Sequence, residues 1–210
     1  MVLWLVFTYS HLMNFLAHFA LSNNNPDLIL GNFLGDFLKA GEEIHWPIPI
    51  RQGILLHRKI DQFTDAHQAV KKLRRQFSSE RRRVSGIILD VTFDHLLLRF
   101  WDQYYPDIDP DGFIQDSYRI LEQARNKFPP RAQRFFHYLT TVNLLASYRQ
   151  LKGVALALDQ LSHRLRQPNH LAGAHMELNR LDGVLAVGFN QLYPDLMRYC
   201  QKWIATELTG

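Results

Sequence analysis

One segment restricts the fold more than any other part of the chain. Residues 86–101, GIILDVTFDHLLLRFW, carry apolar side chains on every side of a helix: Ile87, Ile88, Leu89, Val91, Phe93, Leu96, Leu97 and Leu98. A helix that is apolar all round is buried. Asp90, Asp94 and His95 nevertheless stand in the middle of this segment. The chain is therefore expected to bury ionisable groups in its core.

A buried carboxylate has to be paired, protonated or bound to a metal ion, because an isolated charge in an apolar core is very costly. Asp90 and Asp94 are four residues apart and share one face of the helix. They repel each other unless a cation lies between them. Buried ion pairs, for instance with Arg58 or Arg99, are the alternative. We favour a metal site.

The turn signals along the chain are those of helices. Asn25-Pro26 predicts a cap and the first turn of a helix that runs to about Ala40. No alternating strand pattern of useful length is present. The sequence predicts an all-α protein, one irregular bundle of about eight to ten helices. Further helices are expected over residues 50–64, from a cap at Asp65 to about 77, from a cap at Ser78 or Ser79 to 100 or 101, and at Asp109-Pro110, Pro129-Pro130, Asn169 and Pro194, with breaks at Gly153 and Gly173.

Length and composition agree with one globular domain. A chain of 210 residues can bury a substantial core, and 47% hydrophobic with 21% charged residues excludes disordered and fibrous classes. The single cysteine, Cys200, excludes an intramolecular disulfide and fits a reducing, cytoplasmic compartment. Residues 1–12 are too short and too polar to span a bilayer. We interpret them as an extension upstream of Met13, with a single helical domain over 13–210.

A second candidate segment is LHRKIDQFTD, residues 56–65. His57, Asp61 and Asp65 are spaced by four residues and form one stripe at the edge of the core. Imidazole and carboxylate both suit a divalent transition ion, so His57 and Asp61 are a workable ligand pair. Asp65 has two interpretations, a site residue or a helix cap.

Two earlier residues extend the candidate set. His18 lies in MNFLAHF, residues 13–19, and Asp36 lies in GNFLGDF, residues 31–37, where Gly31 and Gly35 permit another helix to come close. Each residue alone is as readily explained by core packing. Taken with the two later segments, they predict a set of metal ligands comprising His18, Asp36, His57, Asp61, Asp90 and Asp94.

The positive charge of the chain is concentrated in two clusters. The net charge is +4, which permits an acidic partner. Solvated helix faces are one interpretation of the clusters, and a docking surface for an anionic partner is the other. No recognition motif with interleaved aromatic residues supports nucleic acid. The clusters are Lys71, Lys72, Arg74 and Arg75, and then Arg81, Arg82 and Arg83.

The segments MNFLAH, GNFLGDF, LHRKIDQFTD and LDVTFDHLLLRFW together resemble the hallmark segments of the acyl carrier protein phosphodiesterases, an atypical branch of the HD-type metal phosphohydrolases. The resemblance continues through residues 138–149 and 189–197. It implies an HD-phosphohydrolase-like fold and hydrolysis of the phosphodiester that joins 4′-phosphopantetheine to a serine of acyl carrier protein. Holo-carrier would become apo-carrier, with a divalent ion, Mn²⁺ before Mg²⁺ or another transition ion.

The resemblance also implies roles for residues. His57 is followed by Arg58 and not by the aspartate of the usual HD pair, so Asp61 is expected to supply a carboxylate. A metal held there, with Asp90 or Asp94, would lower the pKa of a bound water. The expected catalytic residues are Arg58, which would stabilise charge on the phosphate, His95, which would protonate the leaving serine oxygen or bind metal, and Asp65. The basic clusters would steer the acidic carrier.

Two other functions stay open on the residues alone. An HD-type phosphohydrolase acting on a nucleotide or another small phosphodiester would have the same site. A non-enzymatic helical binding module would have its acids paired with arginine instead of metal.

Overall fold

The computed structural model describes residues 15–165 and 169–207, so the expected extension over residues 1–12 lies outside the described residues. Within those ranges the protein is all-α, with 11 α-helices, 8 of them seven residues or longer, and no strands. The predicted fold class is therefore confirmed. The α-helices are α1 (Phe15–Ala20), α2 (Pro26–Gly35), α3 (Ile48–Ala66), α4 (Gln68–Gln76), α5 (Ser85–Arg99), α6 (Trp101–Tyr104), α7 (Pro110–Ala124), α8 (Pro130–Thr141), α9 (Leu144–Ser147), α10 (Leu151–Arg164) and α11 (His175–Glu207), with short 3-10 helices η1 (Glu42–His45), η2 (Arg82–Val84) and η3 (Arg125–Lys127).

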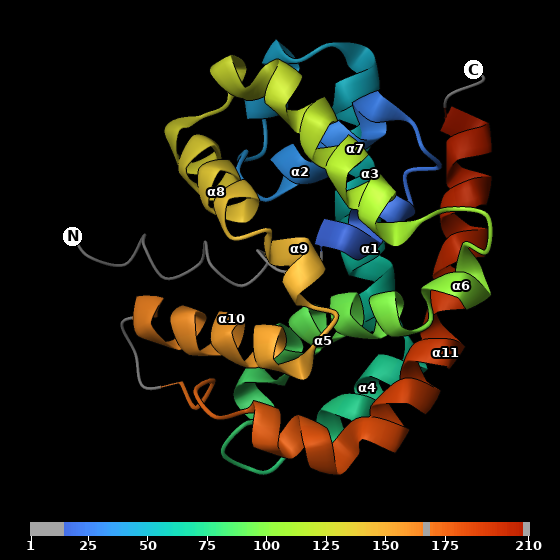
Figure 1. Ribbon diagram of the computed structural model, residues 1–210. Coiled ribbons are helices and arrows are strands. Elements are labelled where there is room, and N and C mark those ends of the chain that lie inside the picture. Colours follow the sequence, from blue (N-terminus) through green and yellow to red (C-terminus); the bar gives the residue numbers. More distant parts are fainter. Residues whose placement is uncertain (1–14, 166–168, 208–210) are drawn as a thin grey trace.

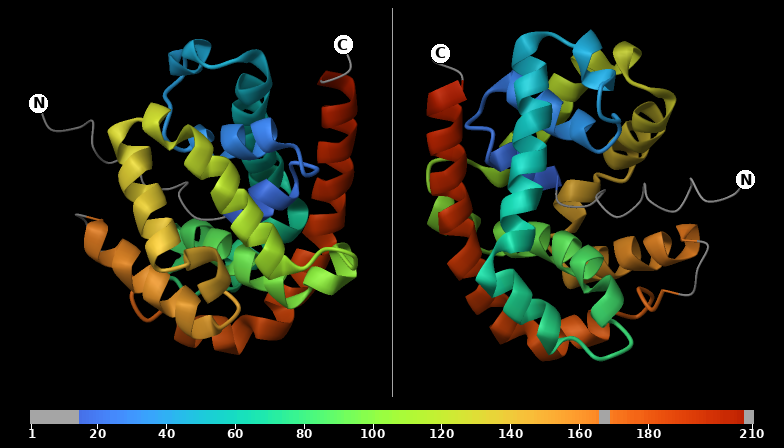
Figure 2. Two further views of the ribbon diagram at one scale, coloured as in Figure 1. Left: turned by 45° about the horizontal axis from the view of Figure 1, so that its top comes forward. Right: turned by 180° about the vertical axis from the view of Figure 1, so that it is seen from behind.

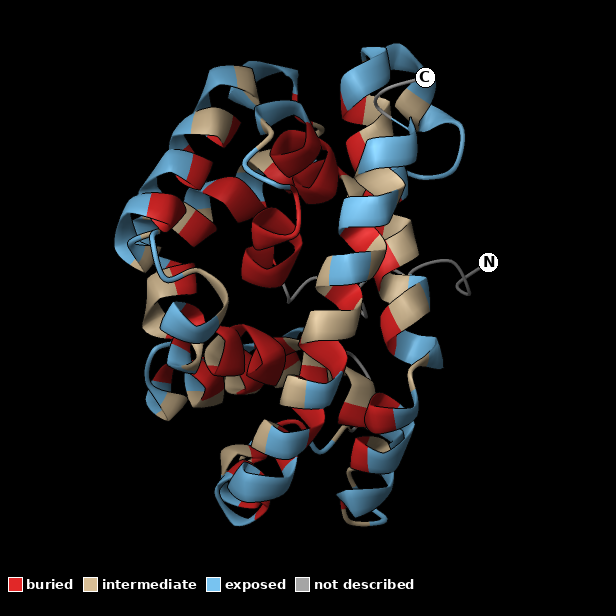
Figure 3. Cartoon of the chain, turned by 90° about the vertical axis from the view of Figure 1, so that its right-hand side faces the viewer, coloured by how far each residue is buried: buried red, intermediate tan, exposed pale blue. Residues whose placement is uncertain are grey.

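The first three α-helices lie at the centre of the upper half of the molecule, between α7 and α8 on one side and α11 on the other (Figure 1). Seen from behind, α3 is unobstructed along its length (Figure 2). Buried residues gather where the helices face one another, and exposed residues cover the outer faces (Figure 3). As the sequence predicts, α5 is buried along most of its length, including Asp94. Among the described residues, no helix is both long and apolar enough to cross a membrane.

Glycines set the distance between α2 and α3. A Cβ atom added at Gly31 would lie 2.3 Å from the carbonyl oxygen of Ile50, and one added at Gly53 would lie 2.8 Å from the Cα of Gly31. The two backbones therefore approach more closely than any side chain would permit. The expectation that Gly31 allows a close helix approach is confirmed. This crossing carries the end of α2 to the middle of α3.

Several caps are those that the sequence predicts. The side chain of Asn25 accepts hydrogen bonds from the backbone N–H groups of Asp27 and Leu28, and Asp109 accepts one from Gly112. The α2 helix, however, ends at Gly35, because Asp36 forms its C-cap, and does not reach Ala40.

Five other expected boundaries are wrong. His67, not Asp65, caps α4 by accepting the N–H of Ala69. Ser78 is held by Glu177, so α5 begins only at Ser85, after η2.

The other three concern the second half of the chain. Gly153 lies inside α10, and Pro194 lies inside α11, which begins at His175 and not at Asn169. A proline inside a helix removes one backbone hydrogen bond and bends it, and α11 turns from the lower edge of the molecule up its side (Figure 1).

Candidate metal centre

Two helices bring three polar side chains together in one cluster. His18 on α1, His57 on α3 and Asp61 on α3 each offer a ligand atom within 4.8 Å of the others. The Nε2 atom of His18 lies 3.2 Å from Oδ1 of Asp61, and the Nε2 atom of His57 lies 3.3 Å from Oδ2 of the same carboxylate. The two imidazole rings stack at 4.3 Å between centroids. Both histidines point their Nε2 atoms at one carboxylate.

The orientation of His18 is set by a chain of buried hydrogen bonds. Its Nδ1 atom lies 3.1 Å from Oδ1 of Asn32, and the Nδ2 group of Asn32 donates to Oγ of Ser22. The Ser22 hydroxyl donates in turn to the carbonyl oxygen of His18. An amide oxygen only accepts, so Nδ1 of His18 carries the proton. In the neutral imidazole the lone pair then lies on Nε2, the atom that faces Asp61, and a metal ligand requires that lone pair.

Asp36 joins the cluster because Gly35 lets α3 come close. A Cβ atom at Gly35 would lie 2.5 Å from Cγ of His57. Asp36 follows as the C-cap of α2, and its Oδ1 lies 3.5 Å from Nε2 of His57. Both carboxylate oxygens of Asp36 are buried, and neither accepts a hydrogen bond from a described residue. A buried carboxylate in that condition is costly unless a cation lies beside it.

His57 lies between two carboxylates. Burial lowers the pKa of His57, but the negative charges of Asp36 and Asp61 outweigh burial and raise it overall. One Nε2 atom cannot donate a single proton to both Asp36 and Asp61. A divalent cation beside Nε2 would meet both carboxylates and both imidazoles, which are ligands that transition ions accept. The donor set therefore fits a buried divalent metal ion.

Asp90 on α5 lies at the edge of this cluster. Burial raises its pKa well above the usual range, and the carboxylates of Asp61, Asp65 and Asp36 raise it further. The positive charge of Arg74 acts in the opposite direction. Asp90 is therefore part of the same concentration of negative charge, although it is not among the three groups whose ligand atoms lie within 4.8 Å of one another.

Comparison with known proteins identifies the family of the chain. A sequence model described as acyl carrier protein phosphodiesterase matches residues 13–196. The chain belongs to the acyl carrier protein phosphodiesterase family. It is 35% identical over 189 residues to the acyl carrier protein phosphodiesterase of Yersinia pestis, covering 90% of this chain and 98% of that protein.

Two further relatives carry the same name. The protein of Pectobacterium atrosepticum is 34% identical over 186 residues, which cover 89% of this chain and 96% of the relative. The protein of Klebsiella pneumoniae is 32% identical over 190 residues, which cover 90% of this chain and 98% of the relative. No solved structure matches the chain.

In this acyl carrier protein phosphodiesterase family member, Asp94 does not lie in the cluster. Its carboxylate accepts the backbone N–H groups of Leu16 and Ala17, at 3.1 and 2.9 Å. These are orphan donors in the first turn of α1, so Asp94 acts as an N-cap supplied by another helix. Burial raises the pKa of Asp94 to about 8, while the two N–H groups lower it. Asp94 holds the short helix that carries His18.

Each of the three residues expected to be catalytic contacts a partner outside the cluster. His95 donates Nδ1–H to the carbonyl oxygen of Tyr148, at 2.7 Å, at the end of α9. Arg58 forms an ion pair with Glu43, at 3.1 Å, and lowers the pKa of that carboxyl. Asp65 is 61% exposed and pairs with Arg74 at 3.4 Å. Asp65 lies one turn beyond Asp61, and the charge of Arg58 still reaches His57, whose pKa it lowers.

The expected basic clusters divide into exposed and engaged residues. Lys71, Lys72 and Arg75 on α4 are exposed, as are Arg82 and Arg83. Arg81 instead holds α11, because it pairs with Glu177 and donates to the carbonyl oxygens of His170 and Ala172. Arg74 turns toward α3 and α5.

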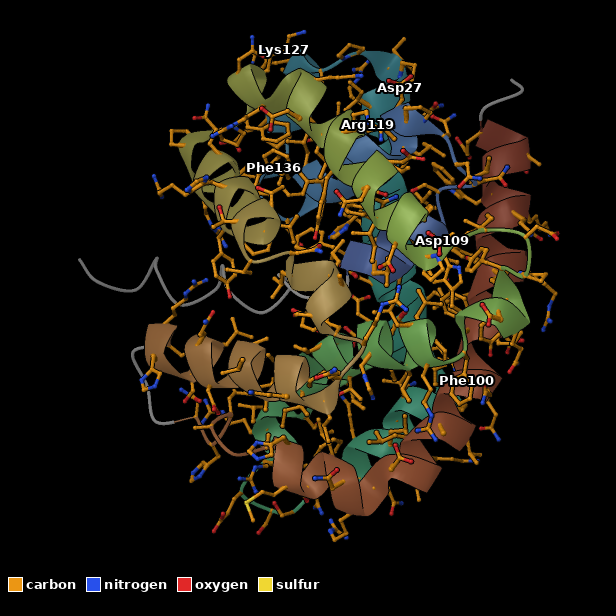
Figure 4. The ribbon with its side chains drawn as sticks, viewed as in Figure 1. Asp27, Phe100, Asp109, Arg119, Lys127 and Phe136 are labelled. Carbon is orange, nitrogen blue, oxygen red and sulfur yellow. The ribbon has the colours of Figure 1, made fainter. Side chains whose placement is uncertain are left out.

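Two surface pockets lie along α7, away from the cluster. One, of about 580 Å³, is lined in part by Asp109 and Arg119, and the other, of about 600 Å³, reaches Asp27 and Lys127. Figure 4 shows Asp109 and Lys127 toward opposite ends of the α7 region. None of the cluster residues lines either pocket, so we do not assign the chemistry to them.

Sequence reasoning missed Asn32 and Ser22. The signal for Asn32 was present, since it is a polar residue in the apolar segment GNFLGDF and lies four residues before Asp36, on the same face of the helix. Ser22 gave no signal of its own, because a serine after a helix is ordinary.

Proposed function

We propose that this protein hydrolyses the phosphodiester between 4′-phosphopantetheine and the serine of acyl carrier protein, and so converts holo-carrier to apo-carrier. Membership of the family and the names of the relatives support the substrate. The observation that carries the proposal is the convergence of His18, His57 and Asp61, with the unsatisfied carboxylate of Asp36 beside them.

We propose that His18, His57 and Asp61 hold a divalent ion, Mn²⁺ in the first instance, with Asp36 as the fourth ligand. A divalent ion at such a site lowers the pKa of a coordinated water and neutralises phosphoryl oxygens. The mixed imidazole and carboxylate donor set suits ions of this kind. Asn32 presents the lone pair of His18, Gly35 lets His57 reach Asp36, and Asp94 anchors the first turn of α1. Asp90 would hold a water or a second ion at the edge of the cluster.

The exposed basic residues are proposed to receive the carrier. Lys71, Lys72 and Arg75 lie on α4, which follows directly from the helix that carries His57 and Asp61. Arg82 and Arg83 lie just before α5, which carries Asp90. A positive surface beside the site steers an acidic protein toward it. The phosphodiester is at the base of the prosthetic arm, so the carrier itself has to dock close to the metal centre.

The decisive experiment incubates the purified protein with holo-acyl carrier protein and Mn²⁺ and follows the carrier by mass spectrometry. Loss of the mass of the phosphopantetheine arm is expected, and chelation by EDTA should stop it. Asp61→Ala is the matched inactive variant. No loss across several divalent ions would reject the proposed substrate, and hydrolysis of a nucleotide phosphodiester in its place would favour the alternative function.

A further inference from the structure

The guanidinium of Arg74 bridges the two helices that carry the acidic residues of the site. From α4, its Nη1 atom reaches 3.4 Å from Oδ1 of Asp65 on α3. On the other side it lies against α5, where a Cβ atom at Gly86 would be 2.3 Å from Nη2 and 3.3 Å from Cζ. A larger residue at this position would displace the guanidinium from its place against α5.

These two contacts place Arg74 one helical turn from the site on both sides. Asp65 lies four residues after Asp61, and Gly86 lies four residues before Asp90. The contact at Asp65 is therefore about 5–6 Å from Asp61 along α3, and the contact at Gly86 is the same distance from Asp90 along α5. The charge of Arg74 reaches Asp90, whose pKa it lowers against the larger effects of burial and of the carboxylates of Asp61 and Asp65. Arg74 is thus a cation at the rim of the carboxylate cluster.

The charge of Arg58 also reaches the cluster, where it lowers the pKa of His57, but Arg58 does not lie between the two helices as Arg74 does. Its guanidinium is engaged with Glu43 beside η1. Arg74 keeps 40% of its side chain exposed, and a guanidinium presents five N–H donors in a planar fork that matches the oxygens of a phosphate group. A phosphodiester that entered between α3 and α5 would meet this fork before the metal centre.

Building on the proposed function, we infer that Arg74 binds the nonbridging oxygens of the phosphodiester. The absence of a side chain at Gly86 makes room for the guanidinium of Arg74. Arg74 therefore has a different role from its neighbours Lys71, Lys72 and Arg75, which face solvent and are proposed to bind the carrier protein. It also transfers to Arg74 the charge-stabilising role that the sequence suggests for Arg58.

Two variants test the inference through different physical changes. Arg74→Gln removes the charge and the fork. Gly86→Ala leaves the arginine in place but inserts a Cβ atom where Nη2 lies, and the flexible end of the side chain can move away without unfolding the protein. Arg119→Gln is the control, because Arg119 is 70% exposed and pairs with Asp116 on α7. Arg75→Gln is measured for comparison, because it shows how the loss of a residue proposed for docking changes the kinetics.

The kinetics are measured on holo-carrier and on bis(p-nitrophenyl) phosphate. Arg74→Gln is expected to lower kcat/KM on both substrates by about 100-fold, the usual effect of losing one charge-stabilising donor. Gly86→Ala should act in the same direction, and the double variant should be no worse than Arg74→Gln alone. Affinity for Mn²⁺ and the melting temperature should match those of Arg119→Gln.

Three results would overturn the inference. They are a loss confined to the carrier, as in Arg75→Gln, a loss of Mn²⁺ affinity that accompanies the loss of activity, and full activity in Gly86→Ala. If the unmodified protein cleaves neither substrate, the proposed function fails. The inference is then judged by calorimetry with inorganic phosphate in the presence of Mn²⁺, where Arg74→Gln and Gly86→Ala should bind at least tenfold more weakly than Arg119→Gln, and equal binding would reject it.

Discussion

The Nδ1–H group of His18 donates to the amide oxygen of Asn32, at 3.1 Å, inside the core. This one bond selects the tautomer of His18 that offers Nε2 to Asp61. Ser22 completes the arrangement, since it accepts from Nδ2 of Asn32 and donates back to the His18 carbonyl. If His18 binds a metal ion as proposed, Asn32 and Ser22 orient that ligand without contacting the ion.

Asn32→Ala should weaken Mn²⁺ binding by about 10- to 100-fold, the range typical of a lost orienting partner. It should also lower the free energy of unfolding by about 1–3 kcal/mol, because the buried Nδ1–H group of His18 loses its acceptor. Calorimetry and urea unfolding measure the two effects. Ser117→Ala, which removes a buried hydroxyl bonded to the Phe113 carbonyl, should lower stability and leave Mn²⁺ affinity unchanged. Unaltered affinity in Asn32→Ala would remove Asn32 from the site.

Gly35→Ala should displace the ring of His57, because the added Cβ would lie 2.5 Å from Cγ. We expect at least a tenfold loss of Mn²⁺ affinity and a loss of stability of about 1–3 kcal/mol from overpacking. Gly183→Ala is the matched control, since nothing lies within 4 Å of the added atom and alanine should raise helix stability by up to about 1 kcal/mol. Wild-type Mn²⁺ binding by Gly35→Ala would place the metal elsewhere.

Asp94→Ala should lower stability without preventing Mn²⁺ binding, whereas Asp61→Ala should prevent Mn²⁺ binding. Asp94→Ala leaves two N–H groups of α1 without an acceptor, so the metal-free protein should lose about 1–3 kcal/mol, yet Mn²⁺ should still raise its melting temperature. Asp61→Ala should abolish that rise, because only a protein that binds the ion is stabilised by it. The measurement is thermal melting with Mn²⁺ and with EDTA. If Asp94→Ala melts normally in EDTA but shows no rise with Mn²⁺, then Asp94 is a ligand after all.

Charge reversal of Arg82 and Arg83 together should raise KM for holo-carrier by roughly tenfold, with the effect reduced at high salt. The two side chains are exposed, whereas Arg81 is omitted because it supports α11. Lys202→Glu, an exposed charge reversal near the end of α11, is the control. An equal loss on bis(p-nitrophenyl) phosphate would exclude a docking role for Arg82 and Arg83.

Glu177 should make the stability depend on pH in the acid range. Burial opposes ionisation of Glu177, but the N–H of Ser78, Arg180, the hydroxyl of Ser78 and Arg81 together lower its pKa. An acid whose pKa is lowered on folding stabilises the folded state above its unfolded pKa, about 4.3 for Glu. That stability is lost as the pH falls through the lower folded value. The difference in unfolding free energy between wild type and Glu177→Gln should therefore be largest near pH 7 and shrink below pH 4.3. A difference that is constant with pH would contradict this.

The α-helical class and the burial of α5 could be read from the sequence because both depend on local periodicity. The spacing of four between His57 and Asp61 likewise puts both on one side of α3 whatever packs against it. The glycines at 31 and 35 correctly indicated a close helix approach. These features follow from residues near one another in the chain.

The tertiary structure decided which partner each polar residue meets. Asp90 and Asp94 share a face of α5, yet Asp94 meets the first turn of α1 while Asp90 meets the acids of α3. Periodicity predicts which residues share a face of a helix, but it does not predict which other helix packs against that face. For the same reason the sequence could not predict that Arg58 pairs with Glu43, or that Arg74 lies between Asp65 and Gly86. The sequence placed the acids in an apolar helix, and packing decided that Asp94 caps α1 while Asp90 lies beside the candidate metal site.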